Sequence, residues 1–370
     1  MKKFTTLLIV VLYVLSCKAI DGNKIIEAAN QAISYSGRID VSVKGQVTFD
    51  WPGVYFKCRF TGKSIGLKLY GDKQISYNVF IDNVPSVVSS ASGEDIIWIA
   101  QNLKSGTHTL QVYKRTEAFL GISTFKGLVL DDNAEVLPWE NISSRKIEFI
   151  GNSITCGYGT EGKNRNERFK PETENNYNSY AAFISRAFNA DYSIIAHSGM
   201  GVVRNYGDSL KVSIAPQMPA RFNQTLDNNL TLMWDFQRWK PDFVVINLGT
   251  NDFSTQPYPD KIIFQRTYEG LITHVRQVYG NLPIFCIVGP MINEPCYSYV
   301  KEMVENYKLL NKSANINFIG IPNELTNGKG DLGSDSHPSA QGQKKMAAMI
   351  APVISSVMGW DYKQEELLIK

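Results

Sequence analysis

Three polar residues in the second half of the sequence could act together on an ester. Ser153 comes shortly after the apolar segment 146–150, Asn251 follows the segment 243–248, and His337 stands in a loop before a helical pattern. A serine hydroxyl becomes a nucleophile when a histidine accepts its proton, and a side-chain amide can stabilise the oxyanion that the attack creates. Each residue alone is also common in turns and caps, so the hypothesis depends on their occurrence together.

A carboxylate stands two residues before the histidine. Because Asp335 and His337 share one short loop, that loop can present both an imidazole and the group that orients it. We therefore predict catalytic roles for Ser153, His337 and Asp335. The chain has no G-x-S-x-G motif, which argues against the ordinary α/β-hydrolase fold.

Metal and cofactor chemistry is not indicated by the sequence. The cysteines form no C-x-x-C pair, and no cluster of histidine and cysteine has the spacing of a metal site. The chemistry proposed for Ser153 and His337 requires neither a metal nor an organic cofactor.

The segments that must position these residues alternate between strand and helix. Strands that are apolar throughout, separated by helices, are typical of a parallel sheet covered on both faces. We expect about five such strands, at Ile147–Ile150, Tyr192–Ala196, Phe243–Leu248, Ile284–Val288 and Ile316–Ile319. The best helix candidates are Tyr180–Phe188, Tyr268–Tyr279, Tyr299–Asn311 and Gln341–Met358. Residues that follow the carboxyl ends of such strands meet at one edge of the sheet, where these folds bind ligands.

The first half has a different pattern, with short alternating segments separated by turns. The segments are Val41–Val47, Ser64–Tyr70, Tyr77–Ile81 and His108–Tyr113. Many short strands at this spacing predict an all-β sandwich or jelly roll. A short helix is expected before them, at Ile25–Ile33. We place the boundary near Pro138, with a β-domain at 20–138 and an α/β domain at 139–362.

The N-terminus has the pattern of an export signal. Lys2 and Lys3 precede a short apolar run, and small residues follow it, so residues 1–19 are predicted to be a signal peptide. The run is too short to favour a transmembrane helix. The four residues that end in Cys17 look like a bacterial lipobox, so a lipid on Cys17 could anchor the protein to a membrane; cleavage after Ala19 is the alternative. We expect an exported protein, whether periplasmic, extracellular or an outer-membrane lipoprotein.

The overall charge excludes one class of partner. The 370 residues contain 38 lysines and arginines against 35 acidic residues, which gives a net charge of +3. This balance gives no reason to expect a nucleic-acid partner.

We expect the protein to be a monomer.

Taken together, these blocks resemble the SGNH (GDSL-type) hydrolase superfamily. The blocks are Gly151-Asn152-Ser153, Ser198-Gly199, Gly249-Thr250-Asn251-Asp252 and Asp335-x-His337. Within it the chain resembles carbohydrate esterase family 2, on the segments 150–159, 198–201, 204–206, 247–253 and 337–338. That family pairs an N-terminal jelly roll with a C-terminal SGNH domain, so the resemblance covers nearly the whole chain after the signal.

The resemblance implies a role for each matching position. It makes Ser153 the nucleophile and His337 the base, with the oxyanion hole formed by Gly199, Asn251 and the backbone N–H of Ser153. Asn152 stands where an aspartate is more usual. Members of the family can orient the histidine with a backbone carbonyl, so the carboxylate of Asp335 remains one of two alternatives.

The implied function is hydrolysis of acetyl esters on plant polysaccharides or oligosaccharides, such as acetylated xylan or mannan. Two alternatives remain: an esterase for another substrate, such as peptidoglycan or lipid, and a non-catalytic glycan-binding protein. Trp234, Trp239, Tyr158 and Tyr206 could stack on a sugar ring, although none is assigned to binding. The polar segment Glu161–Tyr177 follows the nucleophile and could shape the leaving-group side.

Overall fold

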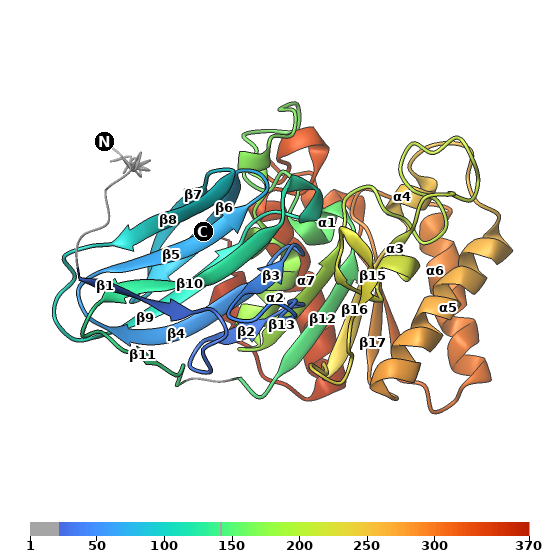
Figure 1. Ribbon diagram of the computed structural model, residues 1–370. Coiled ribbons are helices and arrows are strands. Elements are labelled where there is room, and N and C mark those ends of the chain that lie inside the picture. Colours follow the sequence, from blue (N-terminus) through green and yellow to red (C-terminus); the bar gives the residue numbers. More distant parts are fainter. Residues whose placement is uncertain (1–21, 141–142, 370) are drawn as a thin grey trace.

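The computed structural model describes residues 22–140 and 143–369, which form two domains side by side (Figure 1). The predicted signal segment 1–19, with Cys17, lies outside the described residues. Within the described stretches, no helix has the length and apolar character needed to cross a membrane.

The N-terminal domain is a sandwich of two antiparallel sheets, as the alternating pattern predicts. One sheet has the order β1-β10-β5-β8, with β3 also paired to β10; the other has the order β11-β4-β9-β6-β7, with β2 paired to β4. The first sheet is made of β1 (Asn23–Glu27), β3 (Val47–Phe49), β5 (Ile65–Gly71), β8 (Gly93–Ala100) and β10 (Ser123–Asp131). The second is made of β2 (Ser34–Ser36), β4 (Tyr55–Thr61), β6 (Ile75–Ile81), β7 (Val84–Ser90), β9 (Thr107–Lys114) and β11 (Val136–Leu137).

Two local predictions in this domain are wrong. The helix expected at Ile25–Ile33 is absent, because Ile25 and Ile26 pair with Val129 and Leu128 of β10 and add a strand to the sheet. Pairing with a neighbouring strand here outweighs the local pattern. The strand expected at Val41–Val47 is irregular up to residue 46, and β3 begins only at its last residue.

The C-terminal domain contains a five-stranded parallel sheet with the order β13-β12-β16-β17-β18. The strands are β12 (Lys146–Gly151), β13 (Asp191–Ala196), β16 (Phe243–Asn247), β17 (Ile284–Val288) and β18 (Ile316–Gly320). All five match the predicted segments to within a residue. Because β12 lies between β13 and β16, the chain leaves β12 toward one side of the sheet and later returns to its other side. Such a switch point opens a crevice at the carboxyl edge.

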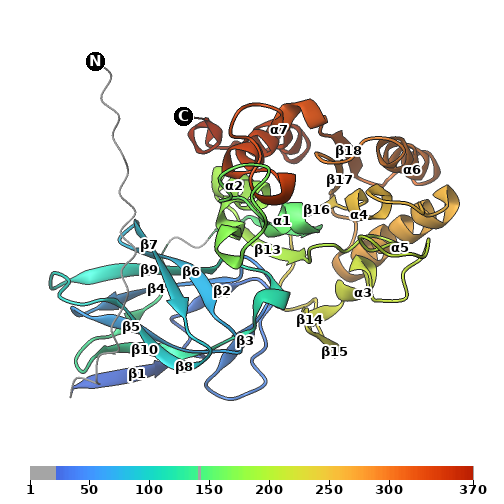
Figure 2. The same cartoon turned by 90° about the horizontal axis from the view of Figure 1, so that it is seen from above.

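Helices cover both faces of this sheet (Figures 1 and 2). The helices α2 (Tyr180–Ala187) and α7 (Ala340–Met358) pack on the face that carries Phe149, while α5 (Lys261–Tyr279) and α6 (Cys296–Leu310) pack on the face that carries Ile246. The remaining elements are short: α1 (Ser153–Cys156), α3 (Met218–Arg221), α4 (Thr250–Phe253), β14 (Gln224–Leu226), β15 (Asn229–Met233), and the 3-10 turns η1 (Ala118–Leu120), η2 (Pro171–Thr173), η3 (Asn176–Asn178), η4 (Asn323–Thr326), η5 (Ser334–Ser336) and η6 (Gln364–Leu367).

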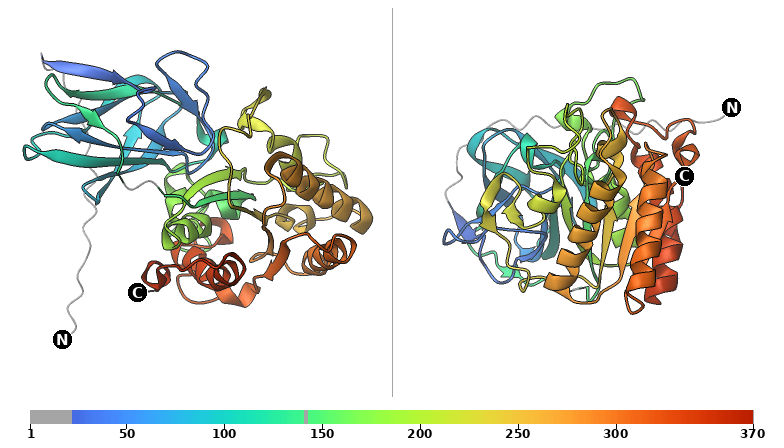
Figure 3. Two further views of the ribbon diagram at one scale, coloured as in Figure 1. Left: turned by 90° about the horizontal axis from the view of Figure 1, so that it is seen from below. Right: turned by 90° about the vertical axis from the view of Figure 1, so that its right-hand side faces the viewer.

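The sandwich packs beside the β13 edge of the parallel sheet (Figure 3), through an interface rich in buried polar groups. Arg38 of the sandwich forms an ion pair of 3.4 Å with Glu148 of β12, and both side chains are only 1% exposed. The indole N–H of Trp51 donates to the carbonyl of Thr225 at 3.1 Å. Buried polar groups must find partners, and here each domain supplies partners to the other.

Candidate active site

Ser153 is positioned by a sharp turn at the carboxyl end of the central strand β12. The side chain of Asn152 accepts a hydrogen bond from the N–H of Ile154 and caps the short helix α1, whose first residue is Ser153. Gly151 is required in this turn, because a Cβ there would lie 2.0 Å from Oγ1 of Thr155. The strand and the cap together place the Ser153 hydroxyl at the carboxyl edge of the sheet.

His337 reaches that hydroxyl from the loop before α7. Its Nε2 lies 2.9 Å from Oγ of Ser153, although the two residues are 184 positions apart in the sequence. Its Nδ1 lies 3.2 Å from the backbone carbonyl oxygen of Asp335. A carbonyl only accepts, so Nδ1 carries the proton and Nε2 is free to accept the proton of the serine. The predicted pair of nucleophile and base is therefore brought together in a reactive tautomer.

The carboxylate of Asp335 does not orient the histidine, and this corrects the triad predicted from the spacing of the two residues. Asp335 and Ser336 adopt left-handed φ angles of 48° and 61°, and this turn directs the carbonyl, not the side chain, toward the imidazole. The carboxylate accepts hydrogen bonds from the hydroxyl of Tyr158 at 2.9 Å and from the N–H of Phe169 at 3.1 Å. The backbone alternative implied by the family resemblance is the one that the structure contains.

Two aromatic rings support the imidazole, a role that no sequence pattern predicted for either of them. The ring of Tyr158 packs on His337 with centroids 4.3 Å apart, and Phe169 stacks on the other side of Tyr158 at 3.9 Å. Removal of water from around the imidazole lowers the pKa of His337 to about 4, against the opposing effect of the Asp335 carbonyl. The histidine is thus neutral near pH 7 and able to act as a base.

The three predicted oxyanion donors lie on neighbouring loops at the same edge of the sheet. Gly199 follows β13 in a left-handed conformation with a φ of 81°, which a glycine adopts without strain. Asn251 lies in α4 just after β16 and donates one proton of its amide to the carbonyl of Met200 at 2.8 Å. An amide nitrogen carries two protons, so this contact fixes the side chain of Asn251 and leaves a second proton for a ligand.

Asp252 holds the backbone of the loop that contains the predicted donors. Its buried carboxylate accepts the N–H groups of Val202 at 2.9 Å, Val203 at 2.7 Å and Arg204 at 2.9 Å. Gly201 has no room for a side chain, because a Cβ would lie 2.0 Å from the carbonyl of Arg204. Asp252 therefore has a structural role, because its carboxylate is occupied by three backbone N–H groups.

Of the four aromatic residues considered for sugar stacking, Tyr206 is the most accessible one near the site. The residue is 64% exposed, and its N–H donates to the carbonyl of Gly199 at 2.7 Å. Trp234 is buried, Trp239 lies beside Lys146 at the opposite end of β12, and Tyr158 supports the histidine.

The segment Glu161–Tyr177 packs against the histidine loop. The N–H of Asp335 donates to the carbonyl of Glu167 at 2.8 Å, and that of Ser336 donates to the carbonyl of Arg165 at 3.1 Å. This segment therefore borders the site, as the sequence suggested.

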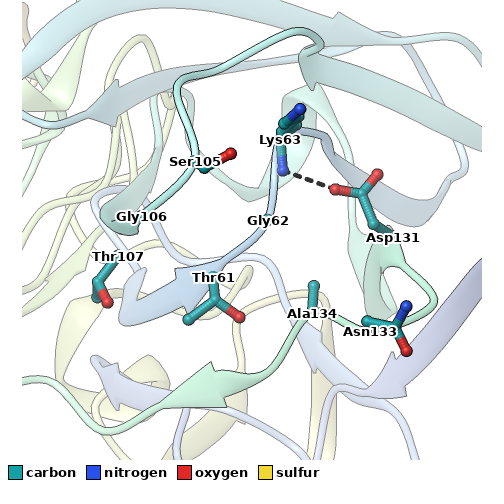
Figure 4. Close-up of a pocket in the computed structure, with 9 residues that line it drawn as sticks. All are labelled: Thr61, Gly62, Lys63, Ser105, Gly106, Thr107, Asp131, Asn133 and Ala134. Carbon is teal, nitrogen blue, oxygen red and sulfur yellow. Dashed lines mark hydrogen bonds between the residues drawn. The ribbon is translucent and has the colours of Figure 1, made fainter.

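A surface cavity of about 480 Å³ lies elsewhere, at the end of the sandwich (Figure 4). It is lined by Thr61, Gly62, Lys63, Ser105, Gly106, Thr107, Asp131, Asn133 and Ala134. Tyr55, at the other end of β4, contacts Asp191 of the parallel sheet, so the cavity faces away from Ser153. Among the residues of the two described stretches, no group of three or more His, Cys, Asp or Glu side chains could hold a metal ion.

A serine hydroxyl bonded to a histidine, beside amide donors at the edge of a parallel sheet, is the arrangement of a serine hydrolase. Comparison with protein-family models refines this class. Residues 35–139 match the N-terminal domain of carbohydrate esterase 2, and residues 149–345 match the GDSL-like lipase/acylhydrolase family. The chain belongs to carbohydrate esterase family 2 and carries an SGNH-type hydrolase domain.

Individual relatives agree with this assignment. The chain is 36% identical to a cellulase/esterase, CelE, from Acetivibrio thermocellus over 336 residues, which are 90% of this chain and 40% of that protein. It is also 36% identical over 242 residues to an acetylxylan esterase/glucomannan deacetylase from Cellvibrio japonicus, which are 64% of this chain and 61% of that protein. The chain therefore spans less than two thirds of either relative.

A solved structure matches almost the whole described chain. It is a family two carbohydrate esterase from Clostridium thermocellum in complex with cellohexaose, with a TM-score of 0.82 and 35% identity over 89% of this chain and 99% of that one.

Proposed function

We propose that this protein is a carbohydrate O-acetyl esterase that removes acetyl groups from plant-type polysaccharides or oligosaccharides. The observation that carries the proposal is the 2.9 Å contact between Oγ of Ser153 and Nε2 of His337 at the carboxyl edge of the sheet. Support comes from the relatives, which include an acetylxylan esterase/glucomannan deacetylase.

The mechanism follows from the geometry. Oγ of Ser153 attacks the acetyl carbonyl while Nε2 of His337 removes its proton, and the Asp335 carbonyl holds the imidazole through Nδ1. The N–H groups of Ser153 and Gly199 and the amide of Asn251 stabilise the oxyanion. The histidine then gives its proton to the leaving sugar hydroxyl, which leaves Ser153 acetylated. Water, deprotonated by the same histidine, releases acetate and restores the serine.

The test is acetate release from acetylated xylan, acetylated glucomannan and small acetyl esters. We expect turnover of an acetylated glycan, and a loss of at least ~10³-fold in kcat for Ser153→Ala and for His337→Ala with unchanged thermal unfolding. Turnover of only peptidoglycan or lipid esters would change the substrate class. Glycan binding without any turnover would favour the non-catalytic alternative.

We also propose that the protein is exported and acts as a monomer, anchored to a membrane when Cys17 is lipidated. The sequence pattern of residues 1–19 supports export. Mass spectrometry of the mature N-terminus distinguishes a lipid-modified Cys17 from cleavage after Ala19. Light scattering measures the oligomeric state.

A further inference from the structure

A carboxylate from the sandwich reaches the loop that carries a predicted oxyanion donor. Glu117 lies in the connection between β9 and β10, at the start of η1, and its side chain is completely buried. Its Oε2 accepts the backbone N–H of Ser198 at 2.6 Å, and its Oε1 accepts the hydroxyl proton of the same residue. Ser198 directly precedes Gly199, so a residue of the N-terminal domain holds the C-terminal domain at the edge of its active site.

Glu117 is itself held firmly from several sides. Its N–H donates to Oε1 of Glu174 at 2.7 Å, and the ammonium group of Lys114 donates to the carbonyl oxygens of Thr116 and Glu117. Burial raises the pKa of both carboxyl groups, Glu117 and Glu174, and lowers that of Lys114 to about 8. In an interior of low dielectric, each of these hydrogen bonds is stronger than it would be in water. The backbone of Glu117, from which its side chain extends to Ser198, therefore has a defined position.

The two contacts from Glu117 determine the orientation of one peptide group. Binding the N–H and the O–H of Ser198 together fixes the peptide group before this residue and the torsion of its side chain. The N–H of Gly199 is in the next peptide group, one backbone rotation away, so its direction depends on this anchor. The other side of this loop is held by its own domain, because Tyr206 donates to the carbonyl of Gly199 and Asn251 donates to that of Met200. An oxyanion donor is effective only when it already points to the place where the charge develops.

We propose that Glu117 is a positioning residue for ester hydrolysis, which orients the N–H of Gly199 through Ser198. The inference depends on the proposed function. It makes the N-terminal domain a part of the catalytic machinery and not only a module beside it. Glu117 touches neither the substrate nor the reacting atoms, so its effect is transmitted through the loop.

If Glu117 had only a structural role, a different result would be expected. A second hydrogen bond across the same domain interface allows the two roles to be distinguished. Tyr55 of the sandwich donates its hydroxyl proton to Asp191, at the amino end of β13 and seven residues before Ser198. Tyr55→Phe removes a hydrogen bond across the same domain interface, at the end of the strand away from the site. A residue that only joins the domains should behave like Tyr55.

The experiment measures kcat and KM for 4-nitrophenyl acetate, together with thermal unfolding, in the full chain. For Glu117→Ala we expect kcat to fall by about 10²-fold with KM nearly unchanged, which is close to the loss of an oxyanion donor. Glu117→Gln should recover most of this activity, because its amide oxygen accepts the N–H of Ser198 and its NH₂ group can donate to the hydroxyl oxygen. Tyr55→Phe should keep the kcat of the wild type.

The outcomes separate the inference from the proposed function. A wild-type protein that hydrolyses no acetyl ester overturns both. An active wild type with an unchanged kcat in Glu117→Ala overturns the inference alone, and so does an equal loss in Glu117→Ala and Tyr55→Phe. If Glu117→Ala does not fold, Ser198→Ala removes the hydroxyl contact from the other side. We expect a smaller fall in kcat for that variant at constant KM, and an unchanged kcat would overturn the inference.

Discussion

The imidazole of His337 is oriented by a neutral oxygen, and its ring is enclosed by Tyr158 and by the loop that carries Asp335. A carboxylate in that position would stabilise the imidazolium that forms when the serine proton is taken. Here the Asp335 carboxylate instead binds Tyr158 and Phe169. The side chain of Asp335 therefore acts on the loop, whereas its backbone acts on the histidine.

Asp335→Asn is expected to have a small effect on catalysis. The amide oxygen can still accept the N–H of Phe169, and the backbone carbonyl that binds His337 is unchanged. We expect kcat to fall by less than ~10-fold, compared with the ~10⁴-fold loss when a triad carboxylate is replaced by an amide. Arg168→Gln is the control, because Arg168 pairs with the same carboxylate but is 90% exposed. A loss near ~10⁴-fold would restore Asp335 as a catalytic group.

The pH dependence should reflect the low pKa of His337. The imidazole must be neutral to accept the serine proton, so activity falls as the pH drops through a pKa of about 4 and not through the ordinary value near ~6.5. The unfolded chain binds a proton at this residue below ~6.5 while the folded chain stays neutral, so His337 reduces stability as the pH falls from there toward 4. Profiles of kcat/KM and of thermal unfolding between pH 4 and 8 measure both effects. An acid limb centred near 6.5 would contradict the prediction.

At the scale of elements, the active site is formed by four connecting segments, which follow β12, β13 and β16 and precede α7. The loop after β13 is held by Asp252, which satisfies three consecutive backbone N–H groups. Buried N–H groups without partners are costly, so this carboxylate determines the shape of the loop.

Asp252→Asn should destabilise the protein and lower its activity together. The NH₂ group of the new side chain must face at least one backbone N–H, and one unsatisfied buried donor costs about 1–3 kcal/mol. We expect a loss of this size in the free energy of unfolding, measured by urea denaturation, and a lower kcat because Gly199 and Met200 lie on the same loop. Asp260→Asn, at an exposed ion pair with Lys211, is the control and should change neither quantity. Full stability in Asp252→Asn would show that the contacts with residues 202–204 contribute little.

Local sequence patterns predicted the strands that are buried along their whole length. They missed the features that depend on residues far away in the sequence. The five parallel strands are apolar throughout, so their positions could be predicted from the sequence. The segment that begins at Ile25 joins a sheet only because β10, about a hundred residues later, offers an edge. The spacing of Asp335 and His337 allowed either the carboxylate or the carbonyl to bind the imidazole, and the left-handed backbone selected the carbonyl. Glu117 carried no local signal, because its partner lies 81 residues away.

At the scale of the whole molecule, the two domains share buried charges. Arg38 donates to Glu148 and to the carbonyls of Phe222 and Gln224, all in the other domain. When one member of such a pair is removed, the other remains charged or unsatisfied in the interior, which typically costs about 3–5 kcal/mol.

Arg38→Met should therefore lower the free energy of unfolding by about 3–5 kcal/mol. We expect calorimetry to show one unfolding transition for the wild type and two for this variant, because the domains lose their coupling. The double variant Arg38→Met/Glu148→Leu is the matched control. Replacing the whole pair by apolar side chains is often neutral, so it should regain much of the loss. If both variants are equally unstable, the energetic coupling does not come from this ion pair.

The position of Glu117 also has a consequence for protein engineering. A β-domain beside a catalytic domain is an obvious candidate for exchange by fusion. In this chain a graft that replaces the sandwich with another β-domain would remove the partner of Ser198 together with that of Glu148. A working chimera would have to carry over the β9–β10 connection and the buried charges of the interface. A β-domain can therefore be exchanged only together with these contacts.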